Sequence, residues 1–297
     1  MLNKNKNLNQ NLNPLFQPQH LTREQFKQIS SYMEKYTGIK MPISKQAMIQ
    51  ARLSNRLKAL GFNSYSQYIE YAFSPNSNKT NELTMMVDLL TTNLTLFFRE
   101  LPHFNFLNEK VLPDLNNRQI KDLSVWSAGC SSGEEPYSLA ISINEFIRTN
   151  PNSFNSFSIL ATDLSTKVLN QAIKGIYSYS SIDKISYDLK KQYFLKSKDP
   201  KKEIVKIKKE IQSKVIFEQL NFMSSNYNKK NTMDIIFCRN VLIYFDKQTQ
   251  YEVIKKLVDC LKPGGYLFLG HSETIFGTNL PLKSVSTTVF QKTKEFR

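Results

Sequence analysis

The sequence predicts an α/β protein in which a mostly parallel sheet carries helices on both faces, behind a small all-helical domain. From about residue 123 onward, short apolar runs of strand length alternate with amphipathic helical patterns. Residues 20–90 hold only helical patterns. The chain has 297 residues, of which 40% are hydrophobic, so it can bury one large core or two modest ones.

The N-terminal part is predicted to be helical after a low-complexity start. Residues 1–19 are rich in asparagine and are predicted to be disordered. Four helices are then expected at Phe26–Tyr36, Ser44–Leu60, Ser66–Phe73 and Asn81–Leu90. A capping box at Thr22–Gln25 precedes the first. The second carries Lys45, Arg52, Arg56 and Lys58, which form either a solvated helix face or a docking surface for an acidic partner.

The C-terminal part supplies the strands of the predicted sheet. They are expected at Leu123–Ala128, Phe157–Ala161, Val215–Gln219, Asp234–Cys238, Tyr266–Gly270 and, near the end, Val285–Phe290. Helices are expected at Ser165–Lys174 and Asp246–Leu261. Tyr177–Lys214 breaks the alternation, and residues 201–211 within it read either as a small basic hairpin or as a solvated loop. In such a sheet, ligands bind at the carboxyl ends of the strands.

The turn after the first strand is the stretch around which the rest of the chain is arranged. Leu123–Ala128 runs into a turn that contains Gly129 and Gly133, and Glu134 and Glu135 open the following helix. Small residues let backbone N–H groups approach a ligand closely. The two acids would repel a diphosphate but suit a ligand with hydroxyls and a cationic group, which points to S-adenosylmethionine. The alternative is an ordinary strand–helix turn, since acids favour the first turn of any helix.

Two further stretches add to this site. Asp163 follows the second strand, about thirty residues after the glycine turn, where an acid can accept both ribose hydroxyls or simply cap a helix. The segment Thr91–Glu100 mixes polar residues with Phe97, Phe98 and a single arginine, Arg99. Two adjacent phenylalanines have to be buried, so this segment is expected to be more than a plain linker.

Charge and cysteine content limit the partners, metal sites and cellular location that we expect. The net charge is +15, from 40 Lys and Arg against 25 Asp and Glu, and favours anionic partners. Cys130, Cys238 and Cys260 lie far apart and have no metal-ligand spacing. No apolar run is long enough to span a bilayer, and there is no signal peptide. We therefore expect a cytoplasmic protein without membrane insertion, without a bound metal, and monomeric.

Taken together, these motifs resemble those of the chemotaxis receptor methyltransferases, the CheR family. The matching stretches occur in the family's order, and they are Thr91–Glu100, Ser127–Ser138, Ala161–Asp163, Phe237–Phe245, Leu261–Gly265 and Gly270–Glu273. The glycine turn alone is a weak signal. The arginine-bearing segment together with the Cys-Arg-Asn-Val-Leu-Ile-Tyr-Phe stretch at Cys238–Phe245 is highly specific, and the resemblance covers about residues 21–291.

The resemblance implies a class I (Rossmann-like) methyltransferase fold with S-adenosylmethionine as methyl donor and S-adenosylhomocysteine as product. It implies a receptor-docking helical domain at 20–90, a linker at 91–101, and a methyltransferase domain at 102–297 with a β-subdomain inserted at about 185–214. In some members this insert binds a receptor tail by strand addition. The implied activity is that of a protein-glutamate O-methyltransferase, acting on the acidic helical bundle of a chemoreceptor cytoplasmic domain.

Site residues carry over from the matching motifs. The residues implied to line the cofactor site are Asn93, Thr95, Arg99, Glu134 or Glu135, Asp163, Asn221, Phe222, Arg239 and Asn240. Asp163 is implied to bind the ribose, one of the two adjacent glutamates the methionine end, and Asn221 with Phe222 the adenine. Tyr244 is placed near the transferring methyl group, and Arg99 and Tyr244 form the predicted catalytic pair.

The chemistry of this reaction fits the residue inventory. A glutamate carboxylate, with a usual pKa of about 4.3, is already a nucleophile at neutral pH and needs no general base. His20, His103 and His271 show no recognisable nucleophile–base arrangement. A nucleic-acid methyltransferase would suit the charge but would carry a proline pair in Arg239–Tyr244, which is absent. The other alternative, a docking module that only senses the cofactor, would be favoured by loss of Arg99 or Tyr244, and both are present.

Overall fold

The computed structural model describes residues 20–74, 79–199, 201–275 and 279–293, so the asparagine-rich segment at 1–19 lies outside the described residues. The chain divides into two compact units. The smaller comprises the described residues up to Tyr32 together with Met41–Leu90, and the larger comprises Met33–Lys40 and everything from Thr91 onward. The assignment of Met33–Lys40 to the larger unit was not predicted from the sequence.

The smaller unit is helical, as the sequence predicted. Its elements are α1 (Arg23–Thr37), of which the last turn belongs to the larger unit, η1 (Ile43–Lys45), α2 (Gln46–Leu60), α3 (Tyr65–Phe73) and α4 (Lys79–Leu90). The capping box is confirmed, because the backbone N–H of Thr22 donates to Gln25 Oε1 and that of Gln25 donates to Thr22 Oγ1. Ile29, Ile49 and Leu53 are fully buried in its core.

The basic residues of α2 do not all face solvent. Arg56 forms a two-pronged ion pair with the buried carboxylate of Glu82 on α4, which raises the pKa of the arginine. Arg52 donates through Nη1 to the carbonyl of Leu90 at 2.8 Å. These two arginines therefore fasten α2 to α4, and only Lys45 and Lys58 of the predicted basic face are exposed.

The larger unit contains a seven-stranded sheet in the order β6-β2-β1-β7-β8-β10-β9. Its strands are β1 (Asp122–Ala128), β2 (Ser156–Asp163), β6 (Val215–Gln219), β7 (Met233–Cys238), β8 (Leu261–Leu269), β9 (Leu282–Ser286) and β10 (Val289–Lys292). Five strands run parallel, and β10 pairs antiparallel with both β8 and β9. The predicted α/β fold with a mostly parallel sheet is confirmed. The last predicted strand is in fact a pair, β9 and β10.

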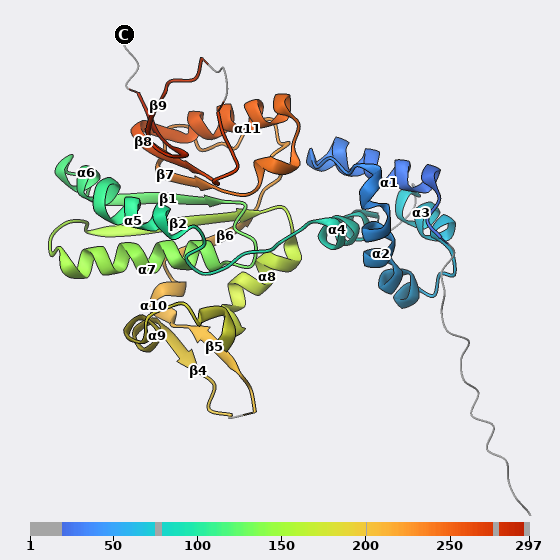
Figure 1. The fold of residues 1–297 in the computed structure, drawn as a ribbon, viewed down its shortest axis with the longest axis horizontal. Coiled ribbons are helices and arrows are strands. Elements are labelled where there is room, and N and C mark those ends of the chain that lie inside the picture. Colours follow the sequence, from blue (N-terminus) through green and yellow to red (C-terminus); the bar gives the residue numbers. More distant parts are fainter. Residues whose placement is uncertain (1–19, 75–78, 200, 276–278, 294–297) are drawn as a thin grey trace, which may run out of the picture. The chain divides into compact units, whose positions relative to one another are not determined.

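Helices cover both faces of this sheet, as Figure 1 shows for α7 and α11. The helices are α5 (Leu101–Phe106), η2 (Leu107–Val111), α6 (Leu112–Asn117), α7 (Glu134–Thr149), α8 (Thr166–Lys174), α10 (Lys209–Gln212), η4 (Leu242–Tyr244) and α11 (Lys247–Cys260). One core packs α5, η2, α6 and α7 against the sheet, and the other packs α11 around the buried Trp126. Because both faces are covered, every residue of the central strand β7 is buried.

A small antiparallel sheet is inserted in the sequence between β2 and β6 of the larger sheet. Its strands lie in the order β3-β5-β4, with β3 at Ile176–Ser178, β4 at Phe194–Lys196 and β5 at Ile204–Ile207. η3 (Tyr179–Ile182) and α9 (Tyr187–Tyr193) connect β3 to β4. Residues 201–211 form neither the hairpin nor the solvated loop that the sequence allowed, because they supply the strand β5 and the start of α10. The first partner of β5, β3, precedes the predicted insert at 185–214.

Of the two adjacent phenylalanines, Phe97 is buried against the small sheet and Phe98 is half-buried against α5. Phe97 packs edge-on against Tyr177 of β3 and Phe194 of β4, with ring centroids 5.0 and 5.4 Å apart. Phe98 packs on Phe104 of α5. Within the described part of the chain, no helix combines the length and apolar character that crossing a bilayer requires.

Candidate active site

The turn after β1 is shaped by two left-handed glycines. Gly129 has φ +85° and Gly133 has φ +98°, a region that favours glycine. A Cβ on Gly129 would lie 2.4 Å from a methyl group of Val241, and one on Gly133 would lie 2.8 Å from the Tyr177 hydroxyl. The N–H of Gly129 donates to the carbonyl of Thr162 on β2 at 2.8 Å. The turn therefore packs tightly against its neighbours through backbone.

Asp163 stands at the carboxyl end of β2, facing this turn. Its carboxylate accepts from the N–H of Ser131 at 2.8 Å and from the N–H of Ser165 at 2.9 Å. A carboxylate has about four acceptor positions, so it can hold the turn and still meet ligand hydroxyls. The sequence allowed Asp163 an alternative role as the cap of the following helix. Ser165 caps α8 instead, because its hydroxyl accepts from the N–H of Val168.

Glu134 and Glu135, which the sequence could not tell apart, have different partners. Glu135 accepts from Ser127 Oγ at 2.7 Å and forms an ion pair with Arg239 Nε at 2.8 Å. Glu134 accepts from Ser132 Oγ at 2.7 Å, and in the described residues no lysine or arginine pairs with it. Burial raises the pKa of Glu134, and the Ser132 hydrogen bond offsets part of that rise. Glu135 is thus neutralised within the protein, whereas Glu134 is a desolvated acid without a cation.

The linker segment lies against the glycine turn and the start of α7. Ser131 Oγ donates to the carbonyl of Asn93 at 2.9 Å, and the N–H of Phe98 donates to Ser138 Oγ at 2.9 Å. Arg99 bends back on its own segment and donates to the carbonyl of Leu94 at 2.9 Å. Of the predicted linker residues, Asn93 is the one brought directly onto the turn.

Arg239, just after β7, is buried beneath the linker, and its side chain is only 1% exposed. Besides Glu135, its guanidinium contacts Glu100 Oε2 at 3.3 Å and donates to the carbonyl of Arg99 at 2.8 Å. It also lies over the rings of Phe104 and Phe237. These contacts give Arg239 a supporting position, in which it joins the linker, α7 and the end of β7.

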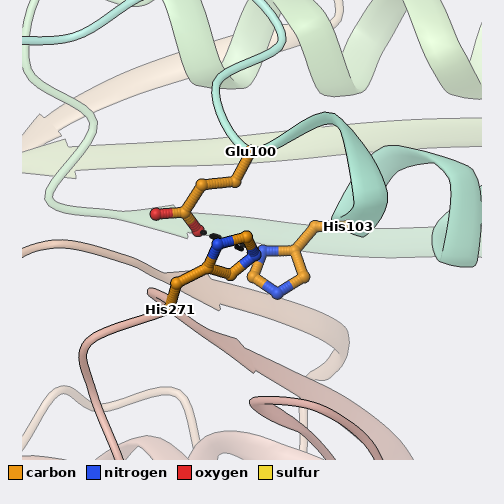
Figure 2. Close-up of side chains that lie close together, drawn as sticks. All are labelled: Glu100, His103 and His271. Carbon is orange, nitrogen blue, oxygen red and sulfur yellow. Dashed lines mark ion pairs between the residues drawn. The ribbon is translucent and has the colours of Figure 1, made fainter.

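Glu100 is a site residue that sequence reasoning missed. It accepts from Asn240 Nδ2 at 3.1 Å and lies 3.3 Å from His103 Nδ1 and 3.9 Å from His271 Nε2, as Figure 2 shows for the histidines. Burial would raise the pKa of Glu100, but its contacts with His103 and Asn240 and the charge of Arg239 lower it to about 2. The carboxylate is therefore ionised at neutral pH. Its left-handed backbone, φ +57°, gives no local sequence signal because such a φ usually marks glycine.

Glu273 is the second missed residue, and it joins two loops. One carboxylate oxygen accepts from the N–H groups of Asn240 and Gly270, and the other accepts from those of Val241 and Leu242. The four distances run from 2.6 to 3.0 Å. Burial raises the pKa of this carboxyl, and the four N–H groups offset part of the rise. Its only sequence signal was the motif Gly270–Glu273.

The remaining predicted site residues do not all lie at the glycine turn. Asn221 is half-buried and donates through Nδ2 to the carbonyl of Tyr36 at 2.6 Å. Phe222 is buried and packs against Tyr227 and Phe245, which makes it part of a hydrophobic core. Tyr244 is half-buried in η4, and its carbonyl accepts from the N–H of Lys40 at 3.0 Å. The structure therefore does not bring Phe222 to the glycine turn as it brings Asn93 and Asp163.

Comparison with protein families decides the classification. A family model described as CheR methyltransferase, SAM binding domain, matches residues 93–291, and one described as CheR methyltransferase, all-alpha domain, matches residues 24–91. The chain belongs to the CheR methyltransferase family. The resemblance inferred from the sequence motifs is confirmed, and S-adenosylmethionine is the cofactor of the larger unit.

Named relatives are similar to this CheR chain over most of its length. A chemotaxis protein methyltransferase of Borreliella burgdorferi is 37% identical over 98% of the chain and 100% of its own length. The protein of the same name in Salmonella typhimurium is 35% identical, covering 93% of this chain and 92% of that one. The Escherichia coli protein is 36% identical over 85% of both. The similarity thus includes both units.

The residues at the carboxyl ends of β1 and β2 fit this cofactor. S-adenosylmethionine carries a sulfonium, an ammonium and two ribose hydroxyls. A desolvated carboxylate that lacks a cation, such as Glu134, is stabilised when a cationic ligand group arrives. Asp163 is an acceptor suited to hydroxyls. The turn of this CheR protein therefore offers an acid and an acceptor that suit the charge and the hydroxyls of the cofactor.

We expect Glu273→Gln to destabilise the larger unit by about 2–3 kcal/mol, because an amide group would face two N–H donors that now share a carboxylate oxygen. Urea unfolding, followed by the fluorescence of the single tryptophan, Trp126, measures this. Glu218→Gln is the matched control, since Glu218 only forms an exposed pair with Lys229. Equal stability of the two variants would show that Glu273 does not hold the loops.

Proposed function

We propose that this protein transfers a methyl group from S-adenosylmethionine to glutamate side chains on the cytoplasmic domain of a chemoreceptor. Family membership and the names of its relatives support methylation in chemotaxis. The observation that carries the choice of acceptor is that Arg99 and Tyr244, each able to donate to a carboxylate, sit on segments tied to the site. The Arg99 segment contacts the turn after β1 through Ser131, and Glu273 holds the loop after β7 that leads to Tyr244. A carboxylate acceptor needs donors and no base.

The cofactor roles follow from the contacts. We assign Asp163 to the ribose and Glu134, the acid without a cation, to the ammonium of the methionine moiety. Asn93 and Thr95 close the site from the linker. Arg239, Asn240 and Glu135 position these groups, since their side chains are engaged with one another and with Glu100. For Asn221 and Phe222 the adenine role rests on their motif alone, because Phe222 packs in a hydrophobic core.

The chemistry asked of the protein is modest. The bound cofactor supplies a methyl group on a positively charged sulfur. The acceptor glutamate arrives ionised, so no proton has to be removed before attack. The Tyr244 hydroxyl and the Arg99 guanidinium hold one acceptor oxygen in line and exclude water around it. A new oxygen–carbon bond forms as the carbon–sulfur bond breaks, and the electron pair of that bond stays on sulfur.

Receptor docking is assigned to the smaller unit. The exposed lysines Lys45 of η1 and Lys58 of α2, together with the net charge of +15, suit an acidic helical bundle. Arg52 and Arg56 are poor choices for testing this idea, because both are bonded inside the unit. Strand addition of a receptor tail to β3 or β4 stays a prediction.

The direct test uses labelled S-adenosylmethionine and the cytoplasmic fragment of a methyl-accepting receptor. A glutamate methyl ester releases labelled methanol in mild base, so we expect volatile label from the modified fragment. A fragment in which the acceptor glutamates are replaced by aspartate is the control and should stay unlabelled. Label that is stable to base, or that appears in added nucleic acid instead, would contradict the proposal.

We expect Tyr244→Phe to lower kcat about tenfold or more while cofactor affinity stays the same, because one transition-state hydrogen bond is lost and the ring is kept. Single-turnover methyl transfer and calorimetry measure the two quantities. Tyr187→Phe, at an exposed position on α9, serves as the matched control. Wild-type transfer by Tyr244→Phe would make Tyr244 a packing residue only.

A further inference from the structure

His271 lies just after the carboxyl end of β8, the strand beside β7. It follows Gly270, and its side chain is 49% exposed. Its ring packs edge-on against the buried ring of His103, with centroids 4.9 Å apart, and its Nε2 lies 3.9 Å from Glu100 Oε2 (Figure 2). The imidazole therefore contacts His103 and Glu100 on one side, and about half of the His271 side chain is exposed to solvent.

The backbone around His271 is fixed by the same carboxylate that fixes the Tyr244 loop. Glu273 accepts from the N–H of Gly270 on one side and from those of Val241 and Leu242 on the other. Leu242 begins η4, which ends at Tyr244. His271 and Tyr244 are therefore carried by two loops that share one anchor at neighbouring strand ends.

The charges around Arg239 show that an incoming carboxylate needs a further hydrogen-bond donor. The buried Arg239 is the positive partner of two carboxylates, Glu100 and Glu135, so this cluster is net negative when both acids are ionised. Glu134 and Asp163 add further negative charge on the cofactor side. A glutamate carboxylate that enters such a region is repelled unless a proton-bearing donor meets it. Arg99 is one donor, and its Nη1 is engaged with the carbonyl of Leu94.

We infer that His271 is a further substrate-contacting residue, whose ring N–H donates to the acceptor carboxylate. This inference rests on the proposed function. Nε2 lies 3.9 Å from Glu100 Oε2, beyond hydrogen-bond distance, and the N–H on Nδ1 donates to the oxygen of the acceptor that is not methylated. Tyr244 and His271 hold the two sides of one carboxylate, which favours a glutamate over a neutral glutamine as acceptor.

A metal site is the competing use of the same cluster. Ligand atoms of Glu100, His103 and His271 lie within 4.8 Å of one another. However, Nη1 of Arg239 lies 3.1 Å from His103 Nδ1 and 3.3 Å from Glu100 Oε2. The position between these two ligands is therefore already next to a fixed positive charge, which opposes a divalent cation.

Two variants at His271 separate a donor from a packing residue. His271→Phe keeps a ring against His103 and removes the donor, whereas His271→Gln keeps a donor and removes the ring. We expect kcat on a receptor fragment to fall about ten- to a hundredfold in His271→Phe and to stay within about threefold of wild type in His271→Gln. The KM for the receptor should change little, because docking is made elsewhere, and cofactor affinity should be unchanged.

The assay starts with base-labile methanol release by the wild-type protein, which tests the proposed function by itself. Given that release, wild-type kcat in His271→Phe would overturn the inference, and so would equal losses in the two variants. A loss of cofactor affinity that matches the loss of kcat would also overturn it. Added Zn²⁺ should leave the wild-type rate unchanged, whereas a zinc effect that disappears in His271→Phe would favour the metal site.

Discussion

The buried guanidinium of Arg239 is the interaction on which the site depends. A charge taken out of water is tolerated only when it is paired and hydrogen-bonded. Arg239 meets this demand with Glu135 at the start of α7, Glu100 at the end of the linker, and the carbonyl of Arg99. Satisfying one buried charge therefore sets the relative positions of three segments that are far apart in the chain.

These same contacts explain how two adjacent acids take different roles. Glu135 lies where Arg239 can neutralise it, and Ser127 completes its hydrogen bonding. Glu134, one residue earlier, has its carboxylate on the Ser132 side of the turn. The protein thus pairs one of the two acids with a buried arginine, and in the described residues the other has no cationic partner.

Much of this could be predicted from local sequence. Apolar runs and their spacing predicted the parallel sheet, and the rule that ligands sit at strand ends put Asp163 and the glycine turn together. Those predictions depend on residues close in the chain or on regular topology. The small sheet was misjudged because its strands are three to four residues long and β3 lies outside the period-two pattern.

The missed residues share a physical reason. Glu100 and Glu273 act through contacts across 139 and 32 positions, with Arg239 and Val241. No local periodicity encodes such pairs. Arg52 and Arg56 looked like a solvated face for a similar reason, because the carbonyl and carboxylate they bind belong to α4. Spacing shows which residues share a face, and only the fold shows what that face meets.

A double-mutant cycle between Arg239 and Glu135 tests the central claim most directly. Arg239→Met, Glu135→Gln and the double variant are compared by urea unfolding of the larger unit, with Trp126 fluorescence as the signal. Each single change should cost about 3–5 kcal/mol, because it leaves a buried charge without its partner, and the double change should cost clearly less than their sum. Additive costs would contradict the account, since the guanidinium and the carboxylate would then be independent of one another.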